Sequence, residues 1–272
     1  MPRKFSFGFL TGGALALLTL ATPAIGAGDL LVAPTRLELD GFRGTEVVLN
    51  NIGSETATYR ISLELRRMTA DGRLEDVTQP TAAEQAALDL ISYAPRRVTL
   101  EPNQPQAIRV GVRPPEGLAE GEYRVHMLFR AIPDAKAPAA PEAPAQGVSV
   151  QLTPIYGVTI PVIVRNGKLA AQAGIANARI VEEGGRQAVS FDLTRSGNRS
   201  LYGEVRVLKP GVGDPVVSAR GIAIYHEIDS RNVTLPVAEG FTGSLAGPAT
   251  IQYLERNPNG SRVLAESQVV LR

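Results

Sequence analysis

The chain has 272 residues, and its 28 Lys and Arg against 27 Asp and Glu give a net charge of +1, so it lacks the one-sided basic charge that is typical of a nucleic-acid-binding protein. It contains no cysteine, which excludes disulfide bonds, thiol catalysis, thiolate metal sites and iron–sulfur clusters. The stability of the folded chain must therefore come from hydrophobic cores.

The N-terminal residues 1–27 have the pattern of a secretory signal peptide. Two basic residues, Arg3 and Lys4, precede an apolar stretch at 5–21, and the small residues ATPAIGA (21–27) supply a cleavage site. A membrane anchor, the alternative interpretation, needs about 20 apolar residues, whereas this stretch is shorter and contains two adjacent glycines. We therefore expect an exported protein and exclude residues 1–27 from the fold.

Residues 28–165 are expected to form a first β-domain. Apolar and polar residues alternate in 59–65, 108–112 and 123–129, and turn sequences rich in Gly, Pro, Asn and Asp separate these segments. The one helix-like run is 81–90 (TAAEQAALDL), short enough for a single surface helix. About seven such strands fit an immunoglobulin-like sandwich.

An Ala/Pro segment follows at 135–147 (AKAPAAPEAPAQG), with no periodicity. Such a composition cannot bury a core and favours an extended chain. It could be a linker between domains. We favour a long loop inside the first domain, because the strand pattern after it continues the pattern before it.

The next segment, Val148 to Arg165, alternates for about three times the usual strand length of 5–6 residues. Pro154 and Pro161 cannot donate hydrogen bonds to a neighbouring strand, so they belong at a sheet edge or a strand boundary. Proteins usually protect an apolar edge with charged residues, but 148–163 contains none. Either the chain covers this edge itself or the edge pairs with another protein. The pattern alone favours a covered strand.

Residues 166–272 are expected to form a second β-sandwich. Their alternating segments are 187–193, 202–208, 249–254 and 263–271. Turn sequences at residues 183–185, 196–198 and 257–260 separate them.

An exported hydrolase is the competing class of protein, but the chain carries no recognisable catalytic or metal-binding motif. It has two histidines, His126 and His226. His126 lies on the less apolar face of its strand and is expected at the solvated surface. His226 lies an even number of positions from three nearby isoleucines, on the same face of an expected strand, and is expected to be partly buried. We therefore predict no enzyme, no metal and no cofactor.

Three motifs together resemble the PapD-like periplasmic chaperones of pilus assembly. They are VAPTRLELDG (32–41), YAPRRVTLEPNQPQAIRVGVR (93–113) and FRAIP (129–133), and their order and spacing hold over about residues 30–165. The second half resembles the family less clearly.

The resemblance implies an all-β fold of two immunoglobulin-like domains in a boomerang arrangement, located in the periplasm. It also implies that the alternating segment lends a strand to a pilus subunit that lacks one, before the subunit passes to an outer-membrane assembly platform. The implied client-binding residues are Val148, Val150, Leu152, Pro154, Tyr156 and Val158. Pro154 departs from the family, whose donor residues are aliphatic at such places.

The family also captures the C-terminal carboxylate of the subunit with an Arg and a Lys. Arg36 matches the Arg, but Pro161 stands where the Lys is expected. Glu122 and Arg165 match two members of the family's interdomain ion-pair cluster, and no third member is identified. From the residues alone, Arg36 could be a solvated arginine, and Glu122 and Arg165 an exposed pair contributing well under ~1 kcal/mol.

The predicted function is a periplasmic chaperone that binds pilus subunits without covalent chemistry. The alternative is a non-catalytic exported structural or adhesion-associated protein that keeps the fold but has lost subunit donation. The proline at position 161 supports this alternative.

Overall fold

The computed structural model describes residues 30–40, 43–133, 155–257 and 260–272. Within these ranges, no helix combines the length and apolar character needed to cross a membrane. The predicted signal peptide and the Ala/Pro segment lie outside the described residues.

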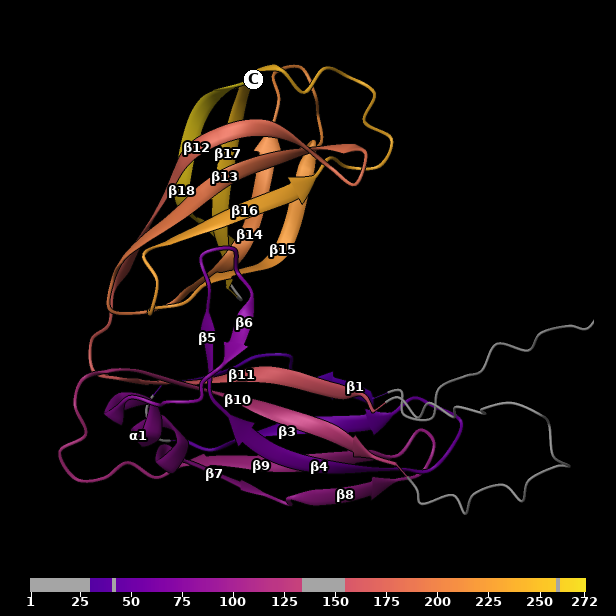
Figure 1. The fold of residues 1–272 in the computed structure, drawn as a ribbon, viewed down its shortest axis with the longest axis vertical. Coiled ribbons are helices and arrows are strands. Elements are labelled where there is room, and N and C mark those ends of the chain that lie inside the picture. The colour runs from indigo at the N-terminus through magenta and orange to yellow at the C-terminus, as the bar shows by residue number, and fades with distance from the viewer. Residues whose placement is uncertain (1–29, 41–42, 134–154, 258–259) are drawn as a thin grey trace, which may run out of the picture.

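The first sandwich consists of two facing sheets (Figure 1). The four-stranded sheet has the order β1 (Leu30–Ala33), β3 (Thr45–Asn51), β9 (Pro105–Val112) and β7 (Ile91–Ala94). The five-stranded sheet has the order β2 (Leu37–Asp40), β11 (Gly157–Asn166), β10 (Gly121–Ile132), β4 (Ala57–Glu64) and β8 (Arg97–Leu100). β1 and β2 belong to one N-terminal segment that crosses from the first sheet to the second, which raises the strand number above the predicted seven.

Alternation along the strands builds the core of this sandwich. In β3, Val47 and Leu49 are fully buried whereas Val48 between them is exposed, as expected when successive side chains point to opposite faces of a sheet. They pack in one cluster with Tyr59 of β4 and Phe129 of β10. The hydrophobic pattern of the sequence therefore sets which face of each strand points inward.

A short insertion between β4 and β7 adds a hairpin and a helix. The hairpin consists of β5 (Arg66–Met68) and β6 (Leu74–Asp76), which pair only with each other. The helix α1 (Ala82–Leu90) begins with a capping box, in which Thr81 and Glu84 each accept a hydrogen bond from the other's backbone N–H. The predicted helix at 81–90 is confirmed.

The second sandwich has one three-stranded and one four-stranded sheet. The first contains β12 (Ala171–Glu183), β13 (Arg186–Gly197) and β16 (Ser230–Pro236), and the second contains β15 (Val217–Ile224), β14 (Leu201–Leu208), β17 (Gly247–Asn257) and β18 (Gly260–Leu271). Phe191, Val205 and Tyr253 are fully buried between them. Gly184 and Gly185, at the predicted turn before β13, both have positive φ, a conformation that favours glycine.

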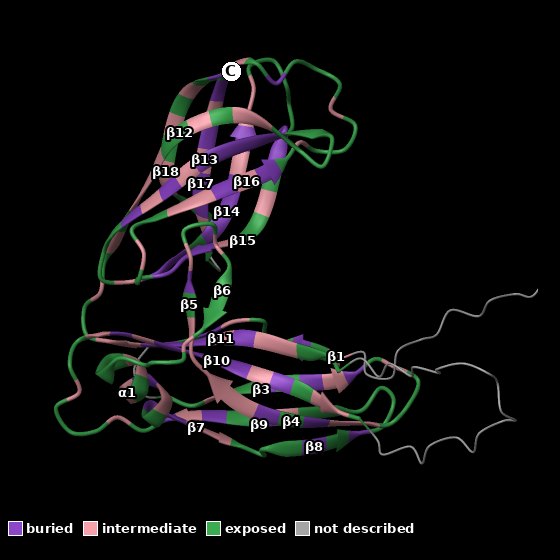
Figure 2. Cartoon of the chain, viewed as in Figure 1, coloured by how far each residue is buried: buried purple, intermediate pink, exposed green. Residues whose placement is uncertain are grey.

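The two sandwiches lie at an angle to each other, with the hairpin β5–β6 between them (Figure 1). Buried residues run along the inner faces of both, and exposed residues along the outer faces and loops (Figure 2). The predicted all-β fold, with two sandwiches in a bent arrangement, is confirmed.

Candidate functional site

The strand β11 has an outer edge that is only half covered. It pairs with β10 along its whole length, but the parallel strand β2 lies only beside Val162 to Arg165. Within the described part of the chain, Gly157 to Pro161 therefore have a strand neighbour on one side only. Such an edge offers unpaired backbone N–H and C=O groups to another strand.

The register shows which residues of β11 point their backbone groups outward. The Ala131 N–H donates to the Tyr156 carbonyl at 2.9 Å, so Tyr156 directs its backbone toward β10. Because backbone direction alternates along a strand, Gly157, Thr159 and Pro161 direct theirs to the outer edge. The missing N–H of Pro161 thus falls on the edge, as its sequence position predicts.

Burial along β11 falls from its C-terminal end to its N-terminal end. Ile160, Val162 and Val164 are almost completely buried in the core of the first sandwich, and Val158 packs partly against that core. Tyr156 is 54% exposed. Of the predicted client-binding residues, Tyr156 is therefore available to a partner and Val158 only partly so. Val148, Val150, Leu152 and Pro154 lie outside the described residues.

Arg36 lies where the two sandwiches meet, in the bend between β1 and β2. Its side chain is only 10% exposed, and its Nε donates to Glu38 at 2.5 Å. The guanidinium stacks over the ring of Tyr202, of β14 in the second sandwich, at 4.5 Å. Both Nη atoms are buried and have no hydrogen-bond partner among the described residues. The solvated-arginine interpretation is therefore wrong.

A second buried arginine, Arg124 of β10, lies beside this position. Its guanidinium stacks over Tyr225 at 3.6 Å, and Arg36 lies 6.0 Å from the same ring. One Nη of Arg124 donates to the Arg66 carbonyl at 2.9 Å and pairs with Glu227. Its Nε and other Nη have no partner in the part of the chain that the structure describes. Two guanidinium groups with free donors thus share one tyrosine.

His126 lies on the same face of β10, and the prediction that it is solvated is wrong. It is 1% exposed, and its ring contacts Tyr225 edge-on at 6.3 Å. Burial, and then the positive charges of Arg124, Arg66 and Arg36, lower the pKa of His126 to about 3. A neutral histidine adds no charge to the ion pairs around it, so the unpaired N–H groups of Arg36 and Arg124 are the donors that could bind an anion such as a carboxylate.

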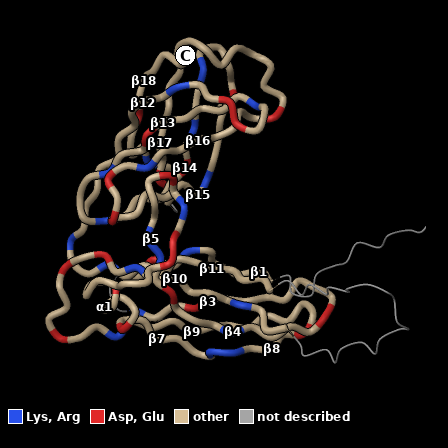
Figure 3. Tube along the Cα trace, viewed as in Figure 1, with Lys and Arg blue, Asp and Glu red and all other residues tan. Residues whose placement is uncertain are grey.

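Sequence reasoning missed this cluster because the polar face of β10 carries Glu122, Arg124 and His126 at alternate positions, a pattern typical of a solvated face. In the structure the second sandwich covers that face instead of water. Figure 3 shows acidic and basic residues on the segments around β5 and β10, where the two sandwiches meet.

Glu122 and Arg165, predicted as an ion pair, are brought together. Arg165 Nε lies 3.2 Å from Glu122, and its Nη1 lies 2.6 Å from Glu38. The Glu122 side chain is fully buried, so the exposed-pair interpretation is wrong.

Both members of this pair belong to the strands of the first sandwich, and other groups make the link to the second. Glu122 accepts hydrogen bonds from the backbone N–H of Ser200, at 3.0 Å, and from its hydroxyl. His226 Nδ1 lies 3.4 Å away. Burial opposes ionisation of Glu122, but the hydrogen bonds from His226 and Ser200 and the charge of Arg165 together lower its pKa to about 2.

His226 was expected to be partly buried, but its side chain is 37% exposed. The strand β15 ends at Ile224, so the alternation that included His226 does not extend to it. Tyr225 takes the buried position instead. The sequence around Ser200 gave no signal for its hydrogen bonds to Glu122.

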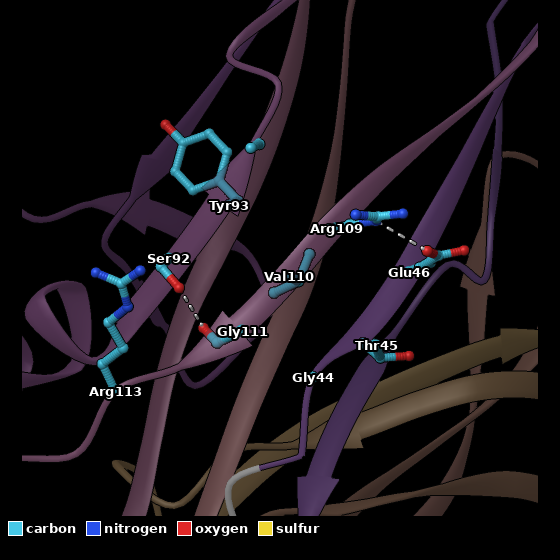
Figure 4. A pocket seen from close by; sticks show the side chains of 10 residues that line it. Gly44, Thr45, Glu46, Ser92, Tyr93, Arg109, Val110, Gly111 and Arg113 are labelled. Atoms are coloured by element: carbon cyan, nitrogen blue, oxygen red, sulfur yellow. Dashed lines mark hydrogen bonds and ion pairs between the residues drawn. The ribbon is translucent and has the colours of Figure 1, made fainter.

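A separate hollow of about 470 Å³ lies on the outer face of the four-stranded sheet of the first sandwich (Figure 4). Gly44 and Gly111 line it and leave room there. Arg109, 86% exposed, pairs with Glu46 at 3.5 Å across its rim. A solvated ion pair contributes little, and the buried donors of the chain lie elsewhere, so we place the candidate site at β11 and the junction.

No protein-family model and no curated protein matches this chain. Among solved structures it is similar to the chaperone DraB of E. coli, at 12% identity and a TM-score of 0.47 over 90% of this chain and 97% of that chain. It is similar to the chaperone CupB2 of Pseudomonas aeruginosa, at 11% identity and a TM-score of 0.47 over 89% of this chain and 100% of that chain. It is also similar to the Salmonella enterica complex of the SafA pilin with the SafB chaperone, at 17% identity and a TM-score of 0.44 over 90% of this chain and 97% of that chain.

Proposed function

We propose that this protein is a periplasmic chaperone that holds a pilus subunit by pairing with it along the outer edge of β11. The open edge at Gly157 to Pro161 carries the proposal. It ends at Tyr156, whose exposed ring could fill a groove in the partner. The resemblance of residues 30–165 to the PapD-like family supports a pilus subunit as the partner, and the signal-like residues 1–27 support export to the periplasm.

Each backbone hydrogen bond formed along the edge would add about 0.5–1.5 kcal/mol, and each buried apolar side chain about 1.5–3 kcal/mol. These gains must exceed an association cost of about 4–15 kcal/mol, so the pairing has to extend over many residues of the strand. In this proposal Val148, Val150, Leu152 and Pro154 extend the alternation of Tyr156 and Val158 into the groove of the subunit.

The junction between the sandwiches would hold the C-terminal carboxylate of the subunit. Arg36 supplies the first cation and keeps two buried nitrogens free for it. Arg124, which also has free donors, supplies the second cation in place of the lysine that Pro161 replaces. A carboxylate between two guanidinium groups gains charge-assisted hydrogen bonds. Delivery of the subunit to an outer-membrane assembly platform completes the proposal.

Site-specific photo-crosslinking in cells tests the edge directly. A photoreactive residue at Thr159, on the outer edge of β11, should crosslink to a small β-rich subunit. The same residue at Arg97, exposed on β8 at the opposite edge of the sheet, is the matched control and should not. Absence of any subunit adduct from Thr159 would favour the alternative, a structural or adhesion-associated protein that has lost subunit donation.

A further inference from the structure

The hairpin β5–β6 leaves the first sandwich and reaches the second (Figure 1). It forms a two-stranded sheet of its own and extends neither sheet of the first sandwich. An isolated two-stranded hairpin is at best marginally stable in water. Its conformation must therefore depend on the surfaces that it contacts at each end.

Polar contacts join the tip end of the hairpin to the second sandwich. In the turn, the Ala70 carbonyl accepts from the backbone N–H of Asn232 in β16 at 2.7 Å. At the last residue of β5 before the turn, the Met68 N–H donates to Glu227 Oε1 at 2.9 Å, and Glu227 also pairs with Arg124. Because β16 pairs with β13 on its other side, the hairpin tip occupies part of the outer edge of β16.

An apolar cluster lies between the same elements. Met68 of the hairpin and Ile163 of β11 pack with Ala223 and Tyr225 of the second sandwich, and all four are buried. Both sandwiches contribute to this cluster, which is separate from their own cores. Separating the sandwiches would expose it to water, at a cost of about 25 cal/mol per Å² of apolar surface.

The turn of the hairpin is fitted to the second sandwich as well. Gly72 has a φ of +83°, and a Cβ added there would lie 2.2 Å from Nε of Arg231. The backbone conformation favours glycine here, and a larger residue would have to displace the guanidinium of Arg231.

The base of the hairpin is fixed to the first sandwich. Arg67 of β5 donates to both carboxylate oxygens of Glu84 in α1, each at 2.6 Å. Arg67 also donates to the Gln79 carbonyl at 3.3 Å. A bidentate pair of this kind fixes both orientation and distance, so it holds β5 against α1 of the first sandwich.

We propose that the β5–β6 hairpin is a clamp that fixes the angle between the two sandwiches, with Met68 and Glu227 as its positioning residues. Domains within one chain move relative to each other by default, unless their interface is large and hydrophobic. The clamp keeps Tyr202 and Tyr225 of the second sandwich over Arg36 and Arg124. This inference stands on the intramolecular contacts and does not depend on the proposed function.

The absence of cysteine makes the test direct. Arg97→Cys on β8 and Val270→Cys on β18 place one exposed spin label on each sandwich, and pulsed dipolar spectroscopy measures the distribution of distances between them. Combining Met68→Ser with Glu227→Ala should broaden that distribution about twofold or more, as expected for a released interdomain contact. Arg73→Ala is the matched control, because Arg73 lies on the same hairpin, is 76% exposed and pairs with Asp71 of the same turn.

Circular dichroism must show that both sandwiches remain folded in the double variant. If that variant unfolds, Glu227→Ala alone removes the polar contact to Met68 and should still broaden the distribution more than Arg73→Ala. A distribution as narrow in the folded variants as in the parent protein overturns the clamp. The linker at residues 167–170 and the Glu122–Ser200 contact would then fix the angle without the hairpin.

Discussion

Replacing Tyr156 and Val162 by glutamate separates the partner-binding part of β11 from its structural part. The two residues lie six positions apart, an even number, so their side chains point to the same face of the strand. Val162 is completely buried in the core, whereas Tyr156 is 54% exposed. Tyr156→Glu should therefore weaken subunit capture and leave folding intact, and Val162→Glu should destabilise the protein itself.

The burial of Val162 sets the size of the second effect. Losing a buried valine costs about 1.5–3 kcal/mol. A carboxyl group in an apolar core stays protonated, with a pKa raised to about 8–9, and at about 1.4 kcal/mol per pKa unit this costs about 4 kcal/mol at pH 7. The total of about 5–7 kcal/mol is a large fraction of the 5–15 kcal/mol that stabilises a typical domain. For the exposed Tyr156, we expect a change within about 0.5 kcal/mol.

Urea denaturation of the isolated variants measures stability, and co-purification with a subunit measures capture. Loss of the Tyr156 contact should weaken capture tenfold or more, since about 1.4 kcal/mol corresponds to a factor of ten. Leu152→Glu should behave like Tyr156→Glu. The division of β11 is refuted if Tyr156→Glu lowers the urea midpoint as much as Val162→Glu, or if it leaves capture unchanged.

Three further predictions follow from the junction. Arg36→Ala should weaken subunit capture more than Arg60→Ala, an exposed arginine on β4, in samples that circular dichroism shows to be folded, because loss of the buried Arg36 also removes its contacts with Glu38 and Tyr202; equal losses in a capture assay would argue against carboxylate binding at Arg36. Because the folded-state pKa of Glu122 is lowered from 4.5 to about 2, its stabilising contribution is complete above about pH 4.5 and is lost as the pH falls toward 2. Glu122→Gln should therefore lower the free energy of unfolding by at most about 3 kcal/mol at neutral pH. In urea titrations this difference between the variant and the parent protein should shrink as the pH falls from 4.5 toward 2. The folded-state pKa of His126 is lowered from 6.5 to about 3, so the unfolded chain takes up a proton that the folded chain does not. Stability should therefore fall as the pH drops from 6.5 toward 3, and His126→Gln should flatten this part of the stability profile. An unchanged profile would show that His126 is protonated in the folded protein.

Local patterns were sufficient to predict several strands and the helix. Alternation at 59–65, 108–112 and 123–129 predicted β4, β9 and β10, and the helix-like run at 81–90 predicted α1. The same alternation was misleading for His126. A period of two shows that one face of a strand is apolar, but it cannot show whether water or another domain covers the other face.

The hairpin β5–β6 illustrates a second reason for the missed contacts. Asp71-Gly72 correctly indicated a turn, but the strands on either side have only three residues each. Their contacts with Asn232 and Glu227 join residues more than 150 positions apart in the chain. Such contacts depend on the angle between the sandwiches, for which no local pattern gives a signal. The resemblance predicted the positions of Arg36, Glu122 and Arg165, but it did not predict Ser200 or Arg124.

The short length of β2 has a consequence for how a partner strand could be exchanged. Because β2 begins beside Val162, the outer edge of β11 has a boundary at which a guest strand must stop, and Pro161 marks it with a missing donor. In the proposed pairing, a guest strand would have one end fixed beside Pro161 and would run from there past Gly157. A competing strand would displace it from its other end, one hydrogen bond at a time, while Val162 and Val164 remain in the core. The exchange would then proceed in a fixed direction without any unfolding of the host.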